Sequence, residues 1–541
     1  MEEKKQTTKK FQLENGIFWP PAIVIIVLLV IGILSGEAFS KGASAALSWC
    51  IDYFGWLYLL FGFIFFAFVL IVMICPIGKL KLGGPDAKPE MNYWNWFAIA
   101  LCAGIAIGIL FWGVAEPLYH YSGPPVWMGL EANSPESAIA ALEISFFHWT
   151  IHPYALYAIF GLAVAYATFN QNLPFRISSG LYPILGKRVF GPIGQAVDGL
   201  AVFAIVGGVV TSLGLGTLQL GAGLKYLTGM EPNNFIYVVI IAIITVGYTM
   251  SSYTGLHRGI KFLSDTNAKV FFFLLLFLFV VGPTKQILEM GVQAMGGYIM
   301  NVVPMSFWAD PFDTGSGWVG GWTVFYWAWW IAFAPVVGMF LARISYGRTV
   351  REFLIVNVLT PAIFGMIWFT VFGGTAISLQ HTGVADLLQT LSDRGTEGAL
   401  FALFAEFPLA FITMPLAFFA VAVSFTTLAD SMTSTLALMT TKGSHMTGEA
   451  PGPVKLFWGL VMGGVTILFL LISGVDSTKA LQTTSIVSAL PIFLIEMATL
   501  VALLFIFYDK GYKSDIQFNE TEYFKHTDKA EVSKSSSNIG A

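Results

Sequence analysis

Charged residues are scarce in this sequence. They account for 11% of the 541 residues, whereas hydrophobic residues account for 56%. A soluble protein carries about 25% charged residues. The composition therefore excludes an ordinary soluble domain and predicts an integral membrane protein that crosses the bilayer many times.

Cysteine is also rare, and the common catalytic motifs are absent. Cys50, Cys75 and Cys102 lie in or beside apolar runs and form neither a disulfide framework nor a zinc motif. The chain has no Walker motif, no GxSxG and no HExxH. The sequence therefore gives no support for a primary pump or an enzyme, and it has no basic face that would indicate nucleic-acid binding.

Two histidines one helical turn apart, His148 and His152, could in principle bind a metal. No cysteine or carboxylate partner completes a metal motif around them, so we predict no metal site. Instead, we expect a structural hydrogen bond, with His148 or His152 satisfied by a neighbouring helix, and Glu143, one turn away, could be the partner.

Apolar runs long enough to cross a bilayer predict twelve transmembrane helices. They fall at 17–39, 53–77, 94–120, 137–168, 197–224, 234–252, 266–284, 319–344, 352–376, 400–440, 454–474 and 484–508. The tenth is overlong and should include a short flanking helix. Residues 285–318 should form an amphipathic helix on the outer surface, with a buried lid as the alternative.

The distribution of basic residues predicts the orientation. Most of the 28 Lys and Arg residues lie in the two termini and in the loops on the same side. The opposite loops carry only Lys41, Lys225, Lys285, Arg394 and Lys479. Positively charged loops stay inside, so both termini are predicted in the cytoplasm of a plasma-membrane protein. The N-terminal tail is residues 1–16, and the polar tail 509–541 is predicted to be disordered.

Aromatic residues are concentrated at depth in two of these spans. Trp327, Trp329 and Trp330 precede the basic residue Arg343, and Trp330 lies roughly 20 Å of helix before it. This depth is unusual for Trp, which favours the membrane interfaces. Such a group could bind a quaternary ammonium on its ring faces, and ordinary packing is the alternative.

The span 137–168 adds a second aromatic set, Trp149, Tyr154 and Tyr157, with spacings near one helical face. Pro153 should kink this helix near its middle. Three further features are candidate ligand sites with structural alternatives. They are Glu116 at the end of the third span, the glycines Gly104, Gly108 and Gly113 within it, and the hydroxyl-rich stretch around Asp430.

Four stretches, FWGVAEPLYHY, FFHWTIHPYALYA, TSLGLGTLQL and YWAWWIAFAPVVGMFLARISYGRTVREF, together resemble the betaine/carnitine/choline transporter family. The resemblance covers nearly all of spans three to ten. It implies two N-terminal helices (17–77) followed by two inverted five-helix repeats (94–284 and 319–508) around a central site, and often a homotrimer. The implied activity is secondary transport of a quaternary ammonium such as glycine betaine, carnitine, choline or a related methylated amine.

By motif match, the resemblance implies a cation-binding box of Trp149, Tyr157, Trp329 and Trp330. Trp327 would line the pathway beside it. Tyr154 stands where the family often has Trp, and Phe333 stands at a commonly aromatic position. The glycine-rich break, Gly104, Ala106 and Gly108, would bring backbone to the substrate, and Ala106 replaces the family's middle glycine.

The coupling ion is left open by the sequence. A sodium site would involve Ala103, Ala106, Thr426 and Thr427. However, Leu428 stands where sodium-coupled members have a second hydroxyl, and Ile205 and Val209 stand where they have hydroxyls in the fifth span. Lys269 could substitute for the sodium charge or could snorkel to the interface. Sodium symport and sodium-independent exchange both remain, a channel or sensor is a remote alternative, and no other cofactor is expected.

Overall fold

The computed structural model describes residues 12–105, 108–254, 257–312, 314, 316–442, 450–473 and 477–508. The predicted tails, 1–16 and 509–541, lie outside the described residues except for 12–16. Regular structure in the described part is helical, apart from two isolated β-bridges. Eleven described helices are long and apolar enough to cross a membrane. The predicted all-α, multi-pass membrane fold is therefore confirmed.

The helices follow the predicted spans closely, and the fourth and tenth spans are each divided into two helices. In chain order, they are α1 (Asn15–Leu34), α2 (Gly36–Ile74), α3 (Tyr93–Ile105), α4 (Gly108–Ser122), α5 (Pro135–Trp149), α6 (Ile151–Gln171), α7 (Tyr182–Leu185), α8 (Pro192–Thr228), α9 (Asn234–Thr254), α10 (His257–Val281), α11 (Thr284–Phe307), α12 (Phe325–Arg343), α13 (Val350–Leu354), α14 (Thr360–His381), α15 (Leu387–Arg394), α16 (Ala399–Ala405), α17 (Ala410–Met439), α18 (Gly452–Ser473) and α19 (Ser477–Tyr508).

Two predictions about span boundaries need comment. The overlong tenth span does contain a short flanking helix, α16, before α17. The loop expected between the first two spans is largely helical, because α2 begins at Gly36, directly after Ser35 ends α1. The stretch from Gly36 to Asp52 contains no proline, so nothing in it blocks a helix once Ser35 has turned the chain.

Burial separates core helices from peripheral ones. In the most apolar part of α5–α6, of α8 and of α12, 89–94% of the residues are buried. The corresponding values for α1, α9 and α10 are 28–33%. Helices that are apolar all round but poorly buried suit contact with lipid. The aromatic helix α12 therefore lies in the protein core, where it packs against α6, α8 and α19.

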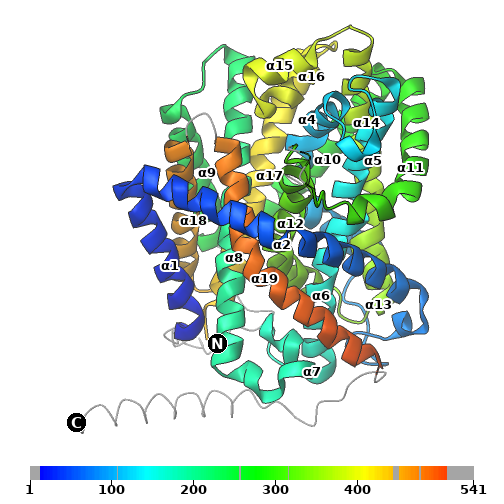
Figure 1. The fold of residues 1–541 in the computed structure, drawn as a ribbon. Helices are drawn as coiled ribbons and strands as arrows, with labels where there is room; N and C mark the ends of the chain where they lie inside the picture. Colours follow the sequence, from blue (N-terminus) through cyan, green and yellow to red (C-terminus); the bar gives the residue numbers. More distant parts are fainter. Residues whose placement is uncertain are drawn as a thin grey trace, which may run out of the picture.

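Figure 1 shows most of the long helices upright in one bundle. α2 and α19 run obliquely across it, and α15 and α16 lie at the end opposite α7. The helix predicted within 285–318 is present as α11, which packs against α5 and α14. Its position at the outer surface remains a prediction.

Candidate functional site

A break in the fourth span sets the position of the first aromatic residue. Pro153 has no N–H to donate to the carbonyl of Trp149, four residues earlier. The helix is interrupted at Thr150, whose backbone angles (φ −116°, ψ −116°) are not helical. The predicted kink is thus present, three residues before the proline. Trp149 ends α5, and Tyr154 and Tyr157 lie in the first two turns of α6.

Five of the predicted aromatic residues converge in the core. The ring centroid of Trp330 lies 5.3 Å from Trp149, 5.4 Å from Tyr157 and 5.9 Å from Tyr154. Trp329 lies 6.4 Å from Trp330 and 6.2 Å from Trp149. All five side chains are at most 7% exposed. We call these five residues, from α5, α6 and α12, the aromatic box.

Gly108 allows the box to form. A Cβ atom at this position would lie 2.3 Å from Cη2 and 2.4 Å from Cζ3 of Trp149. Real Cβ atoms do not approach that closely, so the indole occupies space that only glycine leaves free. Of the other residues predicted in this stretch, Ala106 and the side chain of Ala103 lie outside the described part of the structure, and only the backbone of Gly104 is described.

Two indole N–H groups of the box have no acceptor among the residues that the structure describes. Nε1 of Trp329 and Nε1 of Trp330 are buried, and no described residue accepts a hydrogen bond from either. A buried donor without a partner is costly, by about 1–3 kcal/mol. The box therefore offers two unused donors beside its ring faces.

The third indole N–H of the box, that of Trp149, donates a hydrogen bond to Glu116. Its Oε2 accepts hydrogen bonds from Nε1 of Trp149 (2.5 Å) and the hydroxyl of Tyr326 (2.6 Å). Its Oε1 lies 2.8 Å from Nδ1 of His148 and 3.3 Å from Nε2 of His120. The Glu116 side chain is fully buried.

The acceptor predicted for the histidines was wrong. Glu143 accepts a hydrogen bond from Asn301 of α11 instead, and His152 pairs with Ser306. Glu143 and His148 are five residues apart, so they point about 140° apart around the helix. Glu116, His120 and His148 bring ligand atoms within 4.8 Å of one another, a spacing that could hold a metal ion. In this structure, Oε1 of Glu116 pairs with Nε2 of His120 and with Nδ1 of His148.

Trp327 and Phe333 lie outside the aromatic box. The Trp327 ring stacks on His152 at 5.2 Å with an interplanar angle of 10°. Its Nε1 edge lies against Gly62 of α2, where a Cβ would be only 2.7 Å away. The Phe333 ring packs against Gly208 of α8. Trp327 therefore packs between α6 and α2, and Phe333 packs against α8.

Of the residues predicted for the ion site, the structure describes the side chains of Thr426, Thr427 and Lys269. The hydroxyls of Thr426 and Thr427 donate to the carbonyls of Ala422 and Val423, at 2.9 Å each. Such bonds to the preceding turn are the usual arrangement for hydroxyls within a helix. Lys269 is exposed. The sodium site consequently stays a prediction.

Sequence reasoning missed Tyr326 as part of the site. Its ring lies 5.2 Å from Trp149, and its hydroxyl binds Glu116. Tyr326 precedes Trp330 by one helical turn, and this spacing could have identified it. Thr323, in a π-helical turn (Gly320–Val324) before α12, was missed as well, and it pairs with Nε2 of His148 at 3.0 Å.

Comparison with known proteins extends over nearly the entire chain. Residues 16–511 match the family model described as BCCT, betaine/carnitine/choline family transporter. Glycine betaine transporter OpuD of Bacillus subtilis is 42% identical and aligns with 90% of this chain and 93% of its own. A probable glycine betaine transporter of Desulfitobacterium hafniense is 38% identical, covering 91% and 97%. An ectoine/hydroxyectoine transporter of Virgibacillus pantothenticus is 37% identical, covering 94% and 100%. On this evidence, the chain belongs to the betaine/carnitine/choline transporter family.

Proposed function

We propose that this protein is a secondary transporter of a betaine-type zwitterion, a small molecule with a quaternary ammonium and a carboxylate. The observation that carries the proposal is the aromatic box with its two unpartnered indole N–H groups. The chain's family consists of transporters rather than enzymes. Two relatives are named as glycine betaine transporters and one as an ectoine/hydroxyectoine transporter, which supports glycine betaine as the first substrate to test.

The chemistry of the box suits both ends of such a molecule. A quaternary ammonium has no N–H, so it cannot be recognised by hydrogen-bond acceptors, but it binds to the faces of Trp and Tyr rings. Each desolvated contact of this kind can contribute about 2 kcal/mol. The carboxylate needs donors, and Nε1 of Trp329 and Nε1 of Trp330, which no described residue accepts from, could supply them.

The closed packing of the rings supports a carrier mechanism. The centroids of neighbouring rings are 5.3–6.4 Å apart, so the rings contact one another. A substrate can enter only if the rings separate, and they must then close again around it. Alternating access with an occluded substrate requires such movement, whereas a channel would need a continuous open path. We also propose, from the sequence, cytoplasmic termini, a plasma-membrane location and a homotrimer.

The test is uptake of labelled glycine betaine into proteoliposomes by the Trp330→Leu variant. We expect uptake to be lost while the protein still inserts, because Trp330 contacts every other ring of the box. Trp94→Leu is the matched control, since Trp94 is 72% exposed on α3. Unchanged uptake by Trp330→Leu would refute the proposal.

The proposal has two forms, sodium symport and sodium-independent exchange, which differ in the driving force for transport. Ile205 and Val209 are fully buried and apolar on α8, which favours exchange without sodium. The family default implied by the sequence is sodium symport. Uptake should be measured with and without an inward sodium gradient, and then with substrate loaded inside. Stimulation by sodium supports symport, and stimulation only by internal substrate supports exchange.

A further inference from the structure

Trp149 is held at both of its edges by one helix. Its Nε1 edge donates to Glu116, and its opposite edge, Cη2 and Cζ3, lies against Gly108. Glu116 and Gly108 both belong to α4. The indole therefore spans from a carboxylate on one side to the glycine of the aromatic box on the other.

The hydrogen-bonding partners of Glu116 are compatible with an ionised carboxylate. Trp149 can only donate, and Tyr326, His148 and His120 each have a hydrogen to give. An ionised carboxylate only accepts, so it satisfies all four neighbours at once. In the tautomer whose Nδ1–H donates to Glu116, Nε2 of His148 accepts from the hydroxyl of Thr323.

The negative charge of Glu116 has no ion-pair partner among its hydrogen-bond donors when both imidazoles are neutral. None of the four donors is Lys or Arg. These donors stabilise the charge but do not cancel it. Hydrogen bonding of Nε1 to an anion also polarises the Trp149 ring, which makes its face more attractive to a cation.

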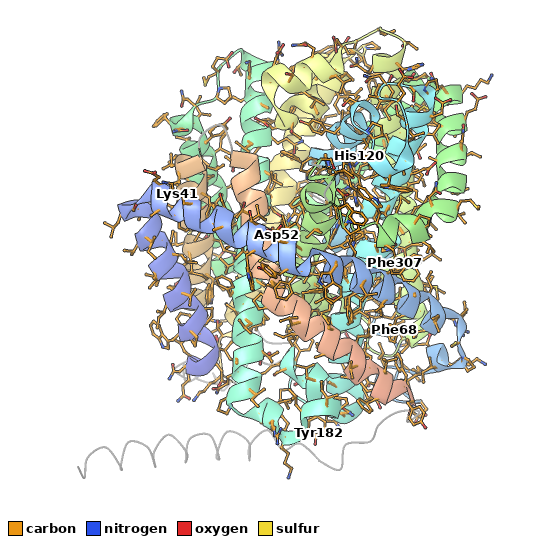
Figure 2. The ribbon with its side chains drawn as sticks, viewed as in Figure 1. Lys41, Asp52, Phe68, His120, Tyr182 and Phe307 are labelled. Atoms are coloured by element: carbon orange, nitrogen blue, oxygen red, sulfur yellow. The ribbon has the colours of Figure 1, made fainter. Side chains whose placement is uncertain are left out.

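We infer that Glu116 is a positioning and selectivity residue, which orients Trp149 and supplies the negative charge that makes the aromatic box prefer a cation to a neutral group of equal shape. This inference rests on the proposed function and adds its electrostatic basis. The same carboxylate holds Tyr326, one turn before Trp330. Glu116 thus joins α4, α5 and α12 at the box. Its hydrogen-bonding neighbour His120 is labelled in Figure 2.

The test compares two ligands of the same shape. Glycine betaine carries a trimethylammonium, and 3,3-dimethylbutanoate carries a tert-butyl group in its place, with the same carboxylate. Both ligands would be measured by competition binding to purified wild-type protein and to the Glu116→Gln variant. Glutamine keeps the size of glutamate and one acceptor oxygen, but it removes the charge and replaces the second acceptor oxygen with an NH2 donor. A unit charge roughly 8 Å from the cation, at an effective dielectric constant of about 20, changes affinity by about tenfold or more.

We expect Glu116→Gln to lower the ratio of glycine betaine affinity to 3,3-dimethylbutanoate affinity about tenfold, because the effect of Glu116 on the carboxylate that both ligands share cancels in this ratio. Glu116→Asp, which keeps the charge, should restore much of the preference for glycine betaine. Equal weakening of both ligands would show a purely structural role and overturn the inference, as would no change in either. Failure of the wild-type protein to bind glycine betaine would instead refute the proposed function.

A second variant keeps the inference testable if Glu116→Gln does not fold. Tyr326→Phe removes one donor from the carboxylate but leaves its charge and the Trp149 bond in place. We expect this variant to keep the preference for glycine betaine over 3,3-dimethylbutanoate within about threefold. Loss of the preference in Tyr326→Phe would show that packing, and not the charge of Glu116, sets the selectivity.

Discussion

At the scale of single residues, the candidate site depends on small side chains as much as on large ones. The Trp149 ring fits because Gly108 has no Cβ, and Trp368 of α14 approaches α4 in the same way at Gly113, where a Cβ would lie 2.6 Å from its Nε1. Two glycines of α4 thus admit two indoles. Glycines in a membrane helix often serve such close packing.

Gly108→Ala should displace Trp149 from the aromatic box. The added methyl group would overlap the indole by more than the ring can accommodate without moving. We expect glycine betaine affinity to fall by about tenfold or more, measured by competition binding. Gly464→Ala is the control, because a Cβ on this glycine of α18 meets nothing within 4 Å. Equal affinities of the two variants would contradict the expected overlap.

A second prediction concerns Glu496 of α19. Its side chain is fully buried, and neither oxygen has a hydrogen-bond partner within the described part of the chain. Because an unpartnered buried polar group is unfavourable, Glu496→Leu should raise stability by about 1–3 kcal/mol. The measurement is the apparent Tm in detergent, and Glu496→Gln, which stays polar, should gain less. A lower Tm or a loss of uptake in Glu496→Leu would indicate that the carboxyl group has a necessary partner.

The residues of the aromatic box could be predicted from the sequence, but those that hold it could not. Trp and Tyr at helical spacing in an apolar span are visible without a structure. The role of Glu116 depends on its hydrogen bond with Tyr326, which is 210 positions away in the chain. No spacing rule connects residues on separate helices. For the same reason, the sequence assigned His148 to the nearby Glu143 rather than to Glu116.

At the scale of elements, the division of the fourth span was signalled by proline. Pro153 explains the break between α5 and α6, whereas residues 106–107, between α3 and α4, lie outside the described part of the chain. The basic residues at the end of α12 and just after it predicted the orientation of the chain in the membrane. In the structure, arginines of this group also have a structural role.

Arg348 and Arg351 attach the segment after α12 to the first half of the chain. The Arg348 guanidinium lies 4.2 Å from the ring centroid of Tyr93 and 4.6 Å from that of Trp96. Arg351 donates to the carbonyls of Met73 and Cys75 at the end of α2, which satisfies groups that a helix terminus leaves free. The isolated bridge between Lys81 and Thr349 adds backbone hydrogen bonds to the same contact.

Arg348→Ala should therefore reduce stability rather than abolish substrate binding. The change removes two ring contacts and a hydrogen bond to the carbonyl of Met91, and we expect a loss of about 1–3 kcal/mol. The apparent Tm in detergent measures it, with Arg188→Ala, an exposed arginine, as control. Arg348→Lys should also lose stability, because an ammonium cannot stack as the planar guanidinium does. A Tm for Arg348→Ala equal to the control would contradict this role.

At the scale of the whole molecule, residues just before α1 connect distant parts of the chain. Leu13 forms a β-bridge with Thr441, and the N–H of Glu14 donates to the carbonyl of Thr440, so this segment lies against the end of α17. The Glu14 carboxylate also binds Arg176, in the segment after α6, at 3.0 Å. The sequence predicted the helical bundle from its apolar runs, but a contact formed by three short polar segments leaves no periodic signal.

The final prediction tests whether this ion pair contributes to the stability of the whole bundle. Glu14 is 3% exposed and Arg176 only partly exposed, so removal of either partner leaves a poorly solvated charge. We expect Glu14→Ala and Arg176→Ala each to cost about 1–3 kcal/mol, and the double variant to cost clearly less than their sum. The exposed pair Lys41 and Glu37, with side chains at 76% and 81% exposure, is the matched control and should show no measurable coupling. Apparent Tm values at one scan rate provide the comparison. Strict additivity at Glu14 and Arg176 would mean that the β-bridge alone holds the segment before α1 to the end of α17.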